Sequence, residues 1–299
     1  MAYRNILIES PAYISLKNSQ LIIHTDCNHS VAVEDISALL IENRQSTITS
    51  AALSILGQSG CVVYVCDERH MPCAVTLPFA QHSRNLSVIQ NQLGTGEVLK
   101  KRLWQNIVVA KIENQARCLR LCGNIGDAEY LERLSSRVHS GDNDNIESTA
   151  ALRYFPALLG RGFSRSVDNG YNAALNYGYA ILRGCVARDL AAYGFIPALG
   201  LHHCSELNSF NLADDLIEPF RPVVDLITAT NFQDDSALTP ENKRALFNCL
   251  NLDIISGGQR HSVSYAVERL VQSLTRALNE KTTMLLLPEL TELKQHAYE

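Results

Sequence analysis

The sequence predicts an α+β protein in which a small, mainly β domain precedes a larger all-α domain. Two observations lead to this prediction. Between residue 4 and about residue 75, short segments alternate apolar and polar residues, a period of two that is typical of half-buried strands. After Pro72 and Pro78 the apolar residues recur at helical spacing and continue to do so. We therefore assign the β domain to residues 1–76 and the helical domain to residues 77–299.

The predicted strands of the first domain are short and are separated by turn residues. They lie at residues 5–10, 12–16, 21–24, 31–34, 38–42 and 61–66, with a helix at residues 50–57. Lys17-Asn-Ser19 predicts a hairpin turn between the second and third strands, because Asn18 tolerates a positive φ angle.

The helices of the second domain are predicted from apolar periodicity and the turn residues between them. The longest begins near Gly96 and continues to about Leu121. Asn145 or Asp144 is expected to cap a helix that carries Glu147 in its first turn, where the macrodipole favours a carboxylate. Other helices are predicted at residues 79–91, 128–138, 171–193, 240–252 and 261–279, and the segment after about residue 282 receives no assignment.

Composition indicates a folded protein without disulfides. The 299 residues are 46% hydrophobic, which is enough to fill a core, and the nine cysteines are scattered without a CxxC pair that could clamp zinc. The N-terminus has no signal-peptide pattern and no apolar run approaches the ~18 residues of a membrane span, so the cytoplasm is the expected compartment. A formal net charge of −5 argues against nucleic acid as a partner unless basic clusters converge.

Metal-binding chemistry is concentrated in residues 200–222, where two imidazoles precede a cluster of three carboxylates, Asp214, Asp215 and Glu218. Asp214 and Asp215 lie four and three residues before Glu218, so either would share a face with it on a continuous helix. Pro219 interrupts this continuity, because proline disfavours helical geometry in the preceding residue. A new helix can begin at Pro219, or an existing one can kink there.

Glu147, one histidine and Glu218 together suggest a Glu/His/Glu site. His202 and His203 are neighbours whose side chains point in different directions, so at most one is expected to be a ligand. Carboxylates with a single imidazole favour Mg²⁺ or Mn²⁺ over zinc. The acids also suit a simpler hypothesis, in which they are charges at helix starts. Cys204 lies beside His203, but adjacent residues seldom provide the geometry of a nucleophile and its base.

Four segments carry a resemblance to a known family. They are Glu147-x-x-Ala-Ala-x-x-Tyr-Phe155, Leu175-Asn-Tyr-Gly-Tyr-Ala-Ile-Leu-Arg183, Gly200-Leu-His-His203 and Asp215-Leu-Ile-Glu-Pro-Phe-Arg-Pro-Val-Val-Asp225. These segments resemble the signature blocks of the CRISPR spacer-acquisition integrase family, and Glu-Pro-Phe-Arg-Pro resembles its type II branch. The four segments follow one another along the chain in the same order as the corresponding blocks of the family. The resemblance is specific in the helical region and rests on the strand pattern alone in the β domain.

The resemblance implies a metal-dependent DNA integrase and endonuclease that acts on double-stranded DNA with Mg²⁺ or Mn²⁺. The family's metal-binding and catalytic residues correspond to Glu147, His203 and Glu218. His203 is preferred to His202 because the family's histidine ends its block. Many relatives have Asp where this chain has Glu218, and Asp215 is the candidate supporting acid.

The resemblance also implies partners and a reaction. The β domains form a homodimer, two such dimers flank a dimer of a small second adaptation protein, and other type II CRISPR proteins are further partners. The 3′-hydroxyl of a captured DNA fragment attacks a phosphodiester of the CRISPR repeat. This transesterification conserves the number of phosphodiester bonds, which agrees with the missing Walker motif.

Because captured sequences vary, the protein is expected to contact mainly the DNA backbone. The hypothetical donors are Arg161, Arg165, Arg183 and Arg221. Two other functional classes remain open at this point. One is a metal-dependent nuclease or phosphohydrolase that cleaves without joining, and the other is a non-catalytic scaffold of a nucleoprotein complex.

Overall fold

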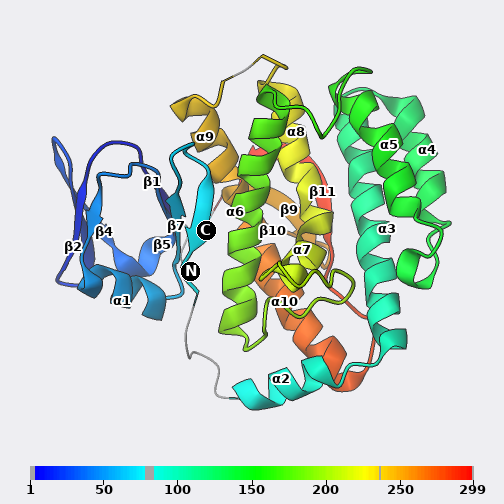
Figure 1. Cartoon of the computed structure of the whole chain (residues 1–299), viewed down its shortest axis with the longest axis horizontal. Helices are drawn as coiled ribbons and strands as arrows, with labels where there is room; N and C mark the ends of the chain where they lie inside the picture. Colours follow the sequence, from blue (N-terminus) through cyan, green and yellow to red (C-terminus); the bar gives the residue numbers. More distant parts are fainter. Residues whose placement is uncertain (1–3, 78–83, 236, 298–299) are drawn as a thin grey trace. The chain divides into compact units, whose positions relative to one another are not determined.

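The structure is a computed structural model, and it describes residues 4–77, 84–235 and 237–297 (Figure 1). The chain divides into two compact units, the first within Met1–Ser83 and the second formed by Arg84–Ala297. The first unit is rich in strands and the second is mostly helical, so the predicted fold class is confirmed. Within the described ranges, no helix is long and apolar enough to span a bilayer.

The first unit contains two four-stranded sheets. One has the order β1-β5-β7-β8, formed by Arg4–Ile8, Ile36–Ile41, Val62–Cys66 and Pro72–Val75. The other has the order β4-β3-β2-β6, formed by Asn28–Ala32, Gln20–His24, Tyr13–Lys17 and Thr47–Ile48. β1, β5 and β7 pair in parallel, and helix α1 (Ser50–Gln58) connects β6 to β7. Apolar side chains from both sheets and α1 form one core, in which Ile14, Leu39 and Leu56 are fully buried.

The hairpin between β2 and β3 is the turn that the sequence predicts. Lys17 pairs with Gln20, and the two residues between them, Asn18 and Ser19, have φ angles of 51° and 58°. Two consecutive left-handed residues are the signature of a type I′ turn, whose twist matches that of the flanking strands.

The second unit is built mainly from nine helices in its described part. They are α2 (Asn85–Leu93), α3 (Glu97–Leu121), α4 (Ile125–Ser135), α5 (Ile146–Leu159), α6 (Gly170–Ala192), α7 (Asn211–Ile217), α8 (Arg221–Asn231), α9 (Pro240–Phe247) and α10 (Val263–Glu280). The predicted start of the first helix at residue 79 lies outside the described residues. Figure 1 shows α3 between the α4–α5 pair and the helices α7 and α8.

The prediction that the second region is all-α requires a correction. It contains a three-stranded antiparallel sheet of order β10-β9-β11, formed by Gln259–Ser262, Leu252–Ser256 and Pro288–Gln295. Gly257 and Gly258 make the turn between β9 and β10, with φ angles of 60° and 76°. β11 lies in the segment that received no assignment, because its charged residues hide the burial of Pro288 and Leu290.

A single asparagine on α3 attaches the C-terminal strand to the centre of this unit. Asn114 is fully buried, and its Nδ2 donates hydrogen bonds to the carbonyl oxygens of Pro219 (2.8 Å) and Pro288 (2.9 Å). Its Oδ1 accepts a hydrogen bond from the backbone N–H of Leu290 at 2.9 Å. α3 therefore holds both β11 and the turn that follows Glu218.

A glycine allows α6 and α8 to approach each other closely. A Cβ atom at Gly178 would lie 2.4 Å from Val224 Cγ1, which is well inside van der Waals contact. This close packing brings Tyr179 of α6 next to Arg221 of α8, whose guanidinium carbon lies 4.4 Å from the centre of the Tyr179 ring.

Candidate metal centre

Glu147 lies in the first turn of α5, as predicted, but a different residue caps the helix. The carboxylate of Asp142 accepts hydrogen bonds from the backbone N–H groups of Ile146 (2.8 Å) and Glu147 (3.0 Å). Asn145 occupies the N-cap position in a left-handed conformation, with a φ angle of 55°, and its side chain makes no capping bond. Asn145 is therefore at the predicted N-cap position, but the capping hydrogen bonds come from the side chain of Asp142.

The helix that contains Asp214 and Asp215 is interrupted at Glu218, the residue before Pro219. α7 ends at Ile217, a 3₁₀ turn follows at Glu218–Phe220, and α8 begins at Arg221. The tighter turn accommodates the proline, which cannot donate a backbone hydrogen bond. Glu218 is buried, and its Oε1 accepts a hydrogen bond from Arg221 Nε at 2.9 Å.

Lys111 of α3 joins the two glutamates that the sequence analysis selected. Its Nζ lies 2.5 Å from Oε1 of Glu147 and 2.5 Å from Oε2 of Glu218, so these two oxygens are at most about 5 Å apart. Lys111 is only 8% exposed. Glu147 and Glu218 are therefore neighbours although they are distant in sequence, and a single cation holds them together.

Sequence reasoning missed Lys111, although a signal was present. The lysine follows Ile107 by one helical turn and precedes Ile112, on a helix whose apolar residues form the core. Lysine is almost never buried without a partner, so a lysine on such a face predicts an acid nearby.

Glu218 and Lys111 are both held in their charged forms. Burial alone would raise the pKa of Glu218, but Arg221 and Lys111 outweigh it and lower that pKa to about 2. Burial likewise opposes the charge on Lys111, yet Glu218 and Glu147 raise its pKa above the usual value. Glu218 is thus an ionised carboxylate that lies between two cations, Lys111 and Arg221.

His203 lies in the loop before α7, and Asp215 determines the conformation of this loop. The Asp215 side chain is fully buried. It accepts backbone N–H hydrogen bonds from Leu201 (2.6 Å), His202 (3.0 Å) and His203 (3.1 Å). It also accepts a hydrogen bond from His203 Nδ1 at 2.6 Å.

The hydrogen bond to Asp215 fixes both the orientation and the tautomer of His203. Since Nδ1 donates to the carboxylate, Nε2 is the ring nitrogen left to bind a metal, the arrangement found for most histidine ligands. The same hydrogen bond raises the pKa of His203 above its usual value. Gly200 makes the tight loop possible, because a Cβ atom there would lie 2.2 Å from the His203 carbonyl oxygen and 2.9 Å from Asp215 Oδ2.

The two adjacent histidines occupy different surroundings, as the sequence predicts. The His202 ring stacks on Trp104 of α3, with 4.3 Å between ring centres and an angle of 1° between the planes. The His203 ring meets Trp104 edge-on at 5.6 Å and 84°. His202 is therefore placed by aromatic stacking, whereas His203 is placed by a carboxylate.

The donor groups fit a hard divalent cation, although Lys111 stands where that cation would lie. In the residues that the structure describes, no three His, Cys, Asp or Glu side chains are grouped as a ready metal site. Two carboxylate oxygens nevertheless converge on one cation, and Glu218 Oε2 is buried without a hydrogen bond of good geometry. Oxygen donors of this kind suit Mg²⁺ and Mn²⁺. The assignment of Glu147, His203 and Glu218 as ligands stays a prediction.

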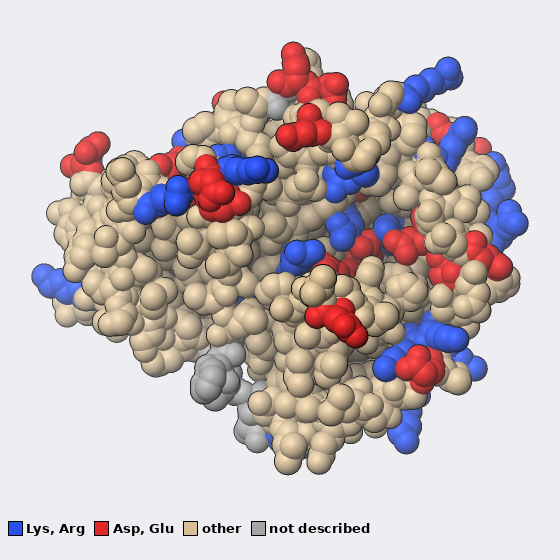
Figure 2. Space-filling view, viewed as in Figure 1, with Lys and Arg blue, Asp and Glu red and all other residues tan. Residues whose placement is uncertain are grey.

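Three of the four arginines selected from the sequence have protein partners. Arg165 donates to the side-chain oxygens of Asn172 (2.6 Å) and Asn176 (2.8 Å). Arg183 pairs with Asp214 at 2.7 Å, and Arg221 pairs with Glu218 as described above. Arg161 is exposed in the connection between α5 and α6. Figure 2 shows acidic and basic side chains gathered in a hollow of the second unit, where Figure 1 places α3, α7 and α8.

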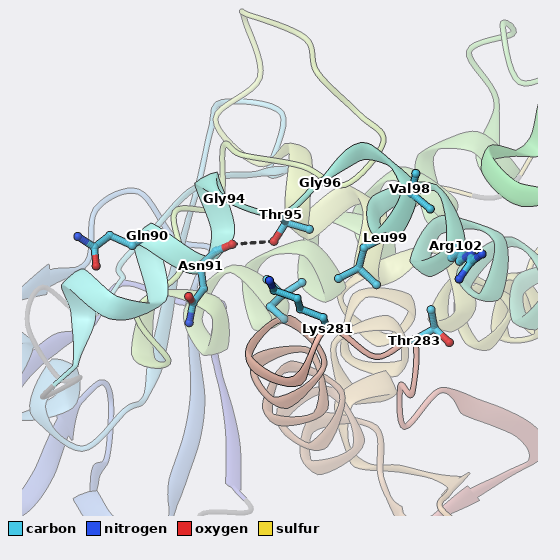
Figure 3. A pocket seen from close by; sticks show the side chains of 11 residues that line it. Gln90, Asn91, Gly94, Thr95, Gly96, Val98, Leu99, Arg102, Lys281 and Thr283 are labelled. Carbon is cyan, nitrogen blue, oxygen red and sulfur yellow. Dashed lines mark hydrogen bonds between the residues drawn. The ribbon is translucent and has the colours of Figure 1, made fainter.

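Two cavities lie near the N-terminal half of α3. One of about 390 Å³ adjoins His203 and is lined also by Lys100, Asn208 and Asn211. The other, of about 630 Å³, lies where α2, α3 and the end of α10 meet, with Arg102 and Lys281 in its lining (Figure 3). None of the predicted site residues lines the larger of these two cavities, whereas the smaller one adjoins His203.

Comparison with known proteins identifies the family of this chain and agrees with its fold. The family model described as CRISPR associated protein Cas1 matches residues 6–241. The CRISPR-associated endonuclease Cas1 of Neisseria meningitidis serogroup C (strain 8013) is 44% identical over 304 residues, covering 100% of both chains. The match to the family model covers more than half of the chain, and this relative is similar over the full length of both chains. The chain belongs to the Cas1 family.

Solved structures share the fold at low sequence identity. A casposase bound to integration product superimposes with a TM-score of 0.75 at 19% identity, covering 94% of this chain and 92% of that one. A partial Cas6-RT-Cas1–Cas2 complex contains a chain that matches with a TM-score of 0.64 at 19% identity, covering 97% and 99%. Both similarities extend over the β-rich and the helical regions.

Proposed function

We propose that this protein is a divalent-metal-dependent DNA endonuclease and integrase, which joins captured double-stranded DNA to a CRISPR repeat by transesterification. Membership of the Cas1 family supports the nuclease activity, and the fold shared with a casposase supports the joining activity. The observation that carries the proposal is the convergence of Glu147 and Glu218 on one cation, together with a histidine oriented by Asp215.

Glu147, His203 and Glu218 would hold the ion, Mg²⁺ or Mn²⁺. When bound, such an ion polarises the scissile phosphate and stabilises the leaving oxygen. Asp215 contributes by accepting the Nδ1–H bond of His203, which presents Nε2 as the binding atom. Arg221 contributes by keeping Glu218 ionised, so that this carboxylate is ready for a cation.

The attacking group is the 3′-hydroxyl of the captured fragment. Its oxygen forms a bond to phosphorus while the bond from phosphorus to the leaving 3′-oxygen breaks. One phosphodiester replaces another, so the step requires neither a protein nucleophile nor ATP. This explains why the chemistry needs only carboxylates, an imidazole and cations from the protein.

The four arginines are proposed to divide into two roles. Arg161, Arg165 and Arg183 have exposed or half-exposed side chains that can reach a DNA backbone, whereas Arg221 lies against Tyr179 and supports the site. A salt titration of DNA binding tests this division. Arg161→Ala should lower the slope of log affinity against log salt by about 1, and an unchanged slope would remove Arg161 from the contacts.

The proposed assembly is a homodimer through the β-rich unit, with two dimers around a dimer of a small Cas2-like protein in the cytoplasm. The solved complex that contains both Cas1 and Cas2 supports the choice of partner. Sedimentation of this chain with and without its partner tests the stoichiometry. A chain that stays monomeric at all concentrations would contradict the dimer.

A strand-joining assay tests the function directly. The reaction contains the protein with its Cas2-like partner, a short duplex with free 3′-hydroxyls, a supercoiled plasmid bearing the repeat, and Mn²⁺ or Mg²⁺. Wild type should give joined product, His203→Ala should give none while still folding and binding DNA, and His202→Ala serves as the matched control. Cleavage without joining would favour a nuclease, and no reaction and no metal binding would favour a scaffold.

A further inference from the structure

Lys111 occupies the space between the two carboxylates that are proposed to bind a metal. Its ammonium nitrogen is 2.5 Å from an oxygen of each, and these contacts connect α3 with α5 and with the turn after α7. Without this cation, two buried or half-buried carboxylates would face each other at close range. Like charges in such a site repel strongly, because water screens them poorly.

A divalent ion cannot use the same position while the ammonium group remains. Mg²⁺ binds oxygen at about 2.0–2.1 Å, so two oxygens on one ion are no more than about 4 Å apart. The Lys111 nitrogen lies at a comparable distance from the same two oxygens, which means that the ion and the ammonium would overlap. Two cations side by side would also leave an excess of positive charge, since Arg221 already neutralises Glu218.

We propose that Lys111 is the resident cation of this centre: it holds Glu147 and Glu218 together before a metal binds, and the metal must displace it to reach both carboxylates. This inference rests on the proposed function, because it presupposes that these carboxylates bind a divalent ion. Lys111 is well suited to the role, since its four-carbon stem is flexible and its charge is compact. The lysine thus keeps the metal-free site folded and lowers its affinity for metal.

The test compares Mn²⁺ binding by the full chain and by Lys111→Met, which keeps a long apolar side chain but removes the charge. Free Mn²⁺ is measured by electron paramagnetic resonance at fixed pH and ionic strength. Lys111→Met should bind Mn²⁺ about tenfold more tightly or better, because no cation competes for the carboxylates. Lys101→Met is the matched control: it removes one charge from the same helix at an exposed lysine that lines neither cavity, and its affinity should equal that of wild type.

Thermal unfolding provides a second measurement that does not depend on catalysis. Without metal, Lys111→Met should unfold at a lower temperature than wild type, because its two carboxylates repel each other. Saturating Mn²⁺ should raise the unfolding temperature of the variant more than that of wild type. Equal or weaker Mn²⁺ binding by Lys111→Met would overturn the inference about Lys111.

If the variant does not fold, wild type alone can decide the matter. Acylation of lysine amines, followed by mass spectrometry, reports how accessible the Lys111 nitrogen is. Mn²⁺ should accelerate labelling of Lys111 severalfold and leave labelling of Lys101 unchanged, whereas an unchanged rate at Lys111 while Mn²⁺ binds would overturn displacement. If neither wild type nor variant binds Mn²⁺, both this inference and the proposed metal centre fail; if both bind it equally, only the inference fails.

Discussion

The two halves of the candidate centre are held in place by different means. His203 belongs to a loop whose backbone N–H groups converge on the buried Asp215 carboxylate, so its position is set by hydrogen bonds that need no metal. Glu147 and Glu218 come from separate elements and are joined by the Lys111 ammonium. The histidine half is therefore preorganised, whereas the glutamate half is held by a cation that can be exchanged.

The difference extends to the response of each half to pH. Glu218 has a lowered pKa, so its contribution to stability is present above its ordinary value of 4.5 and is lost as pH falls towards about 2. His203 has a raised pKa, so its contribution is present below its ordinary value of 6.5 and is lost as pH rises through the raised pKa. The two halves are thus weakened at opposite ends of the pH range.

The largest loss of unfolding free energy is expected from Asp215→Ala, which removes the carboxylate that organises the His203 loop. Three backbone N–H groups and the His203 ring lose their buried acceptor, and at about 1 kcal/mol or more for each of these four hydrogen bonds to a carboxylate we expect a loss of about 4 kcal/mol or more. Urea unfolding measures this loss. Hydrogen exchange should also show that the amides of residues 201–203 become unprotected.

Asp214→Ala is the matched control for Asp215. Asp214 precedes it on α7, but its carboxylate pairs with the side chains of Arg183 and Asn208. The control should lose less stability and leave residues 201–203 protected. Equal losses for the two variants would contradict the assignment of Asp215 as the residue that organises the loop.

The next effect in size is expected from Glu218→Gln, which breaks the cation-held half. Lys111 and Arg221 would be left partly uncompensated in a buried site, and removing one partner of a buried ion pair costs about 3 kcal/mol or more. Glu147→Gln should cost less, because the Glu147 side chain is 25% exposed. Denaturant unfolding of both variants measures the difference, and Lys111→Met should recover part of the loss in Glu218→Gln. Equal losses of unfolding free energy in Glu218→Gln and Glu147→Gln would contradict this prediction.

Lowering the pH is expected to reduce the unfolding free energy of wild type by a smaller amount. Between pH 6 and pH 3, wild type should lose about 2 kcal/mol of unfolding free energy more than Glu218→Gln does, because the glutamine has no proton to gain. Above pH 6.5 the comparison concerns His203. The unfolding free energy of wild type should fall as pH rises, and that of His203→Gln should fall less, because glutamine has no proton to lose. Parallel pH profiles of wild type and both variants would contradict the two pKa shifts.

The sequence predicts individual residues of this centre better than the contacts between them. The turn at Asn18 and the position of Glu147 in a first helical turn follow from local preferences, which act over a few residues. Family resemblance selects two acids and the histidine, Glu147, Glu218 and His203. The bridge formed by Lys111 depends on how three distant segments pack, and no local pattern specifies that packing. The sheet that contains β11 was missed for a similar reason, because β9, α3 and α8 bury part of this charged segment and are distant from it in sequence.

The smallest effect is expected from His202→Phe, which compares the two adjacent histidines. The His202 ring stacks flat on Trp104, and a phenyl ring can keep that contact, so stability should change by less than about 1 kcal/mol. The backbone N–H of His202 still binds Asp215 in the variant. Strand joining should therefore persist in His202→Phe and disappear in His203→Ala, measured on the same DNA with the same Cas2-like partner. Loss of joining in His202→Phe with an intact fold would place the metal-binding imidazole at His202 and overturn the preference for His203.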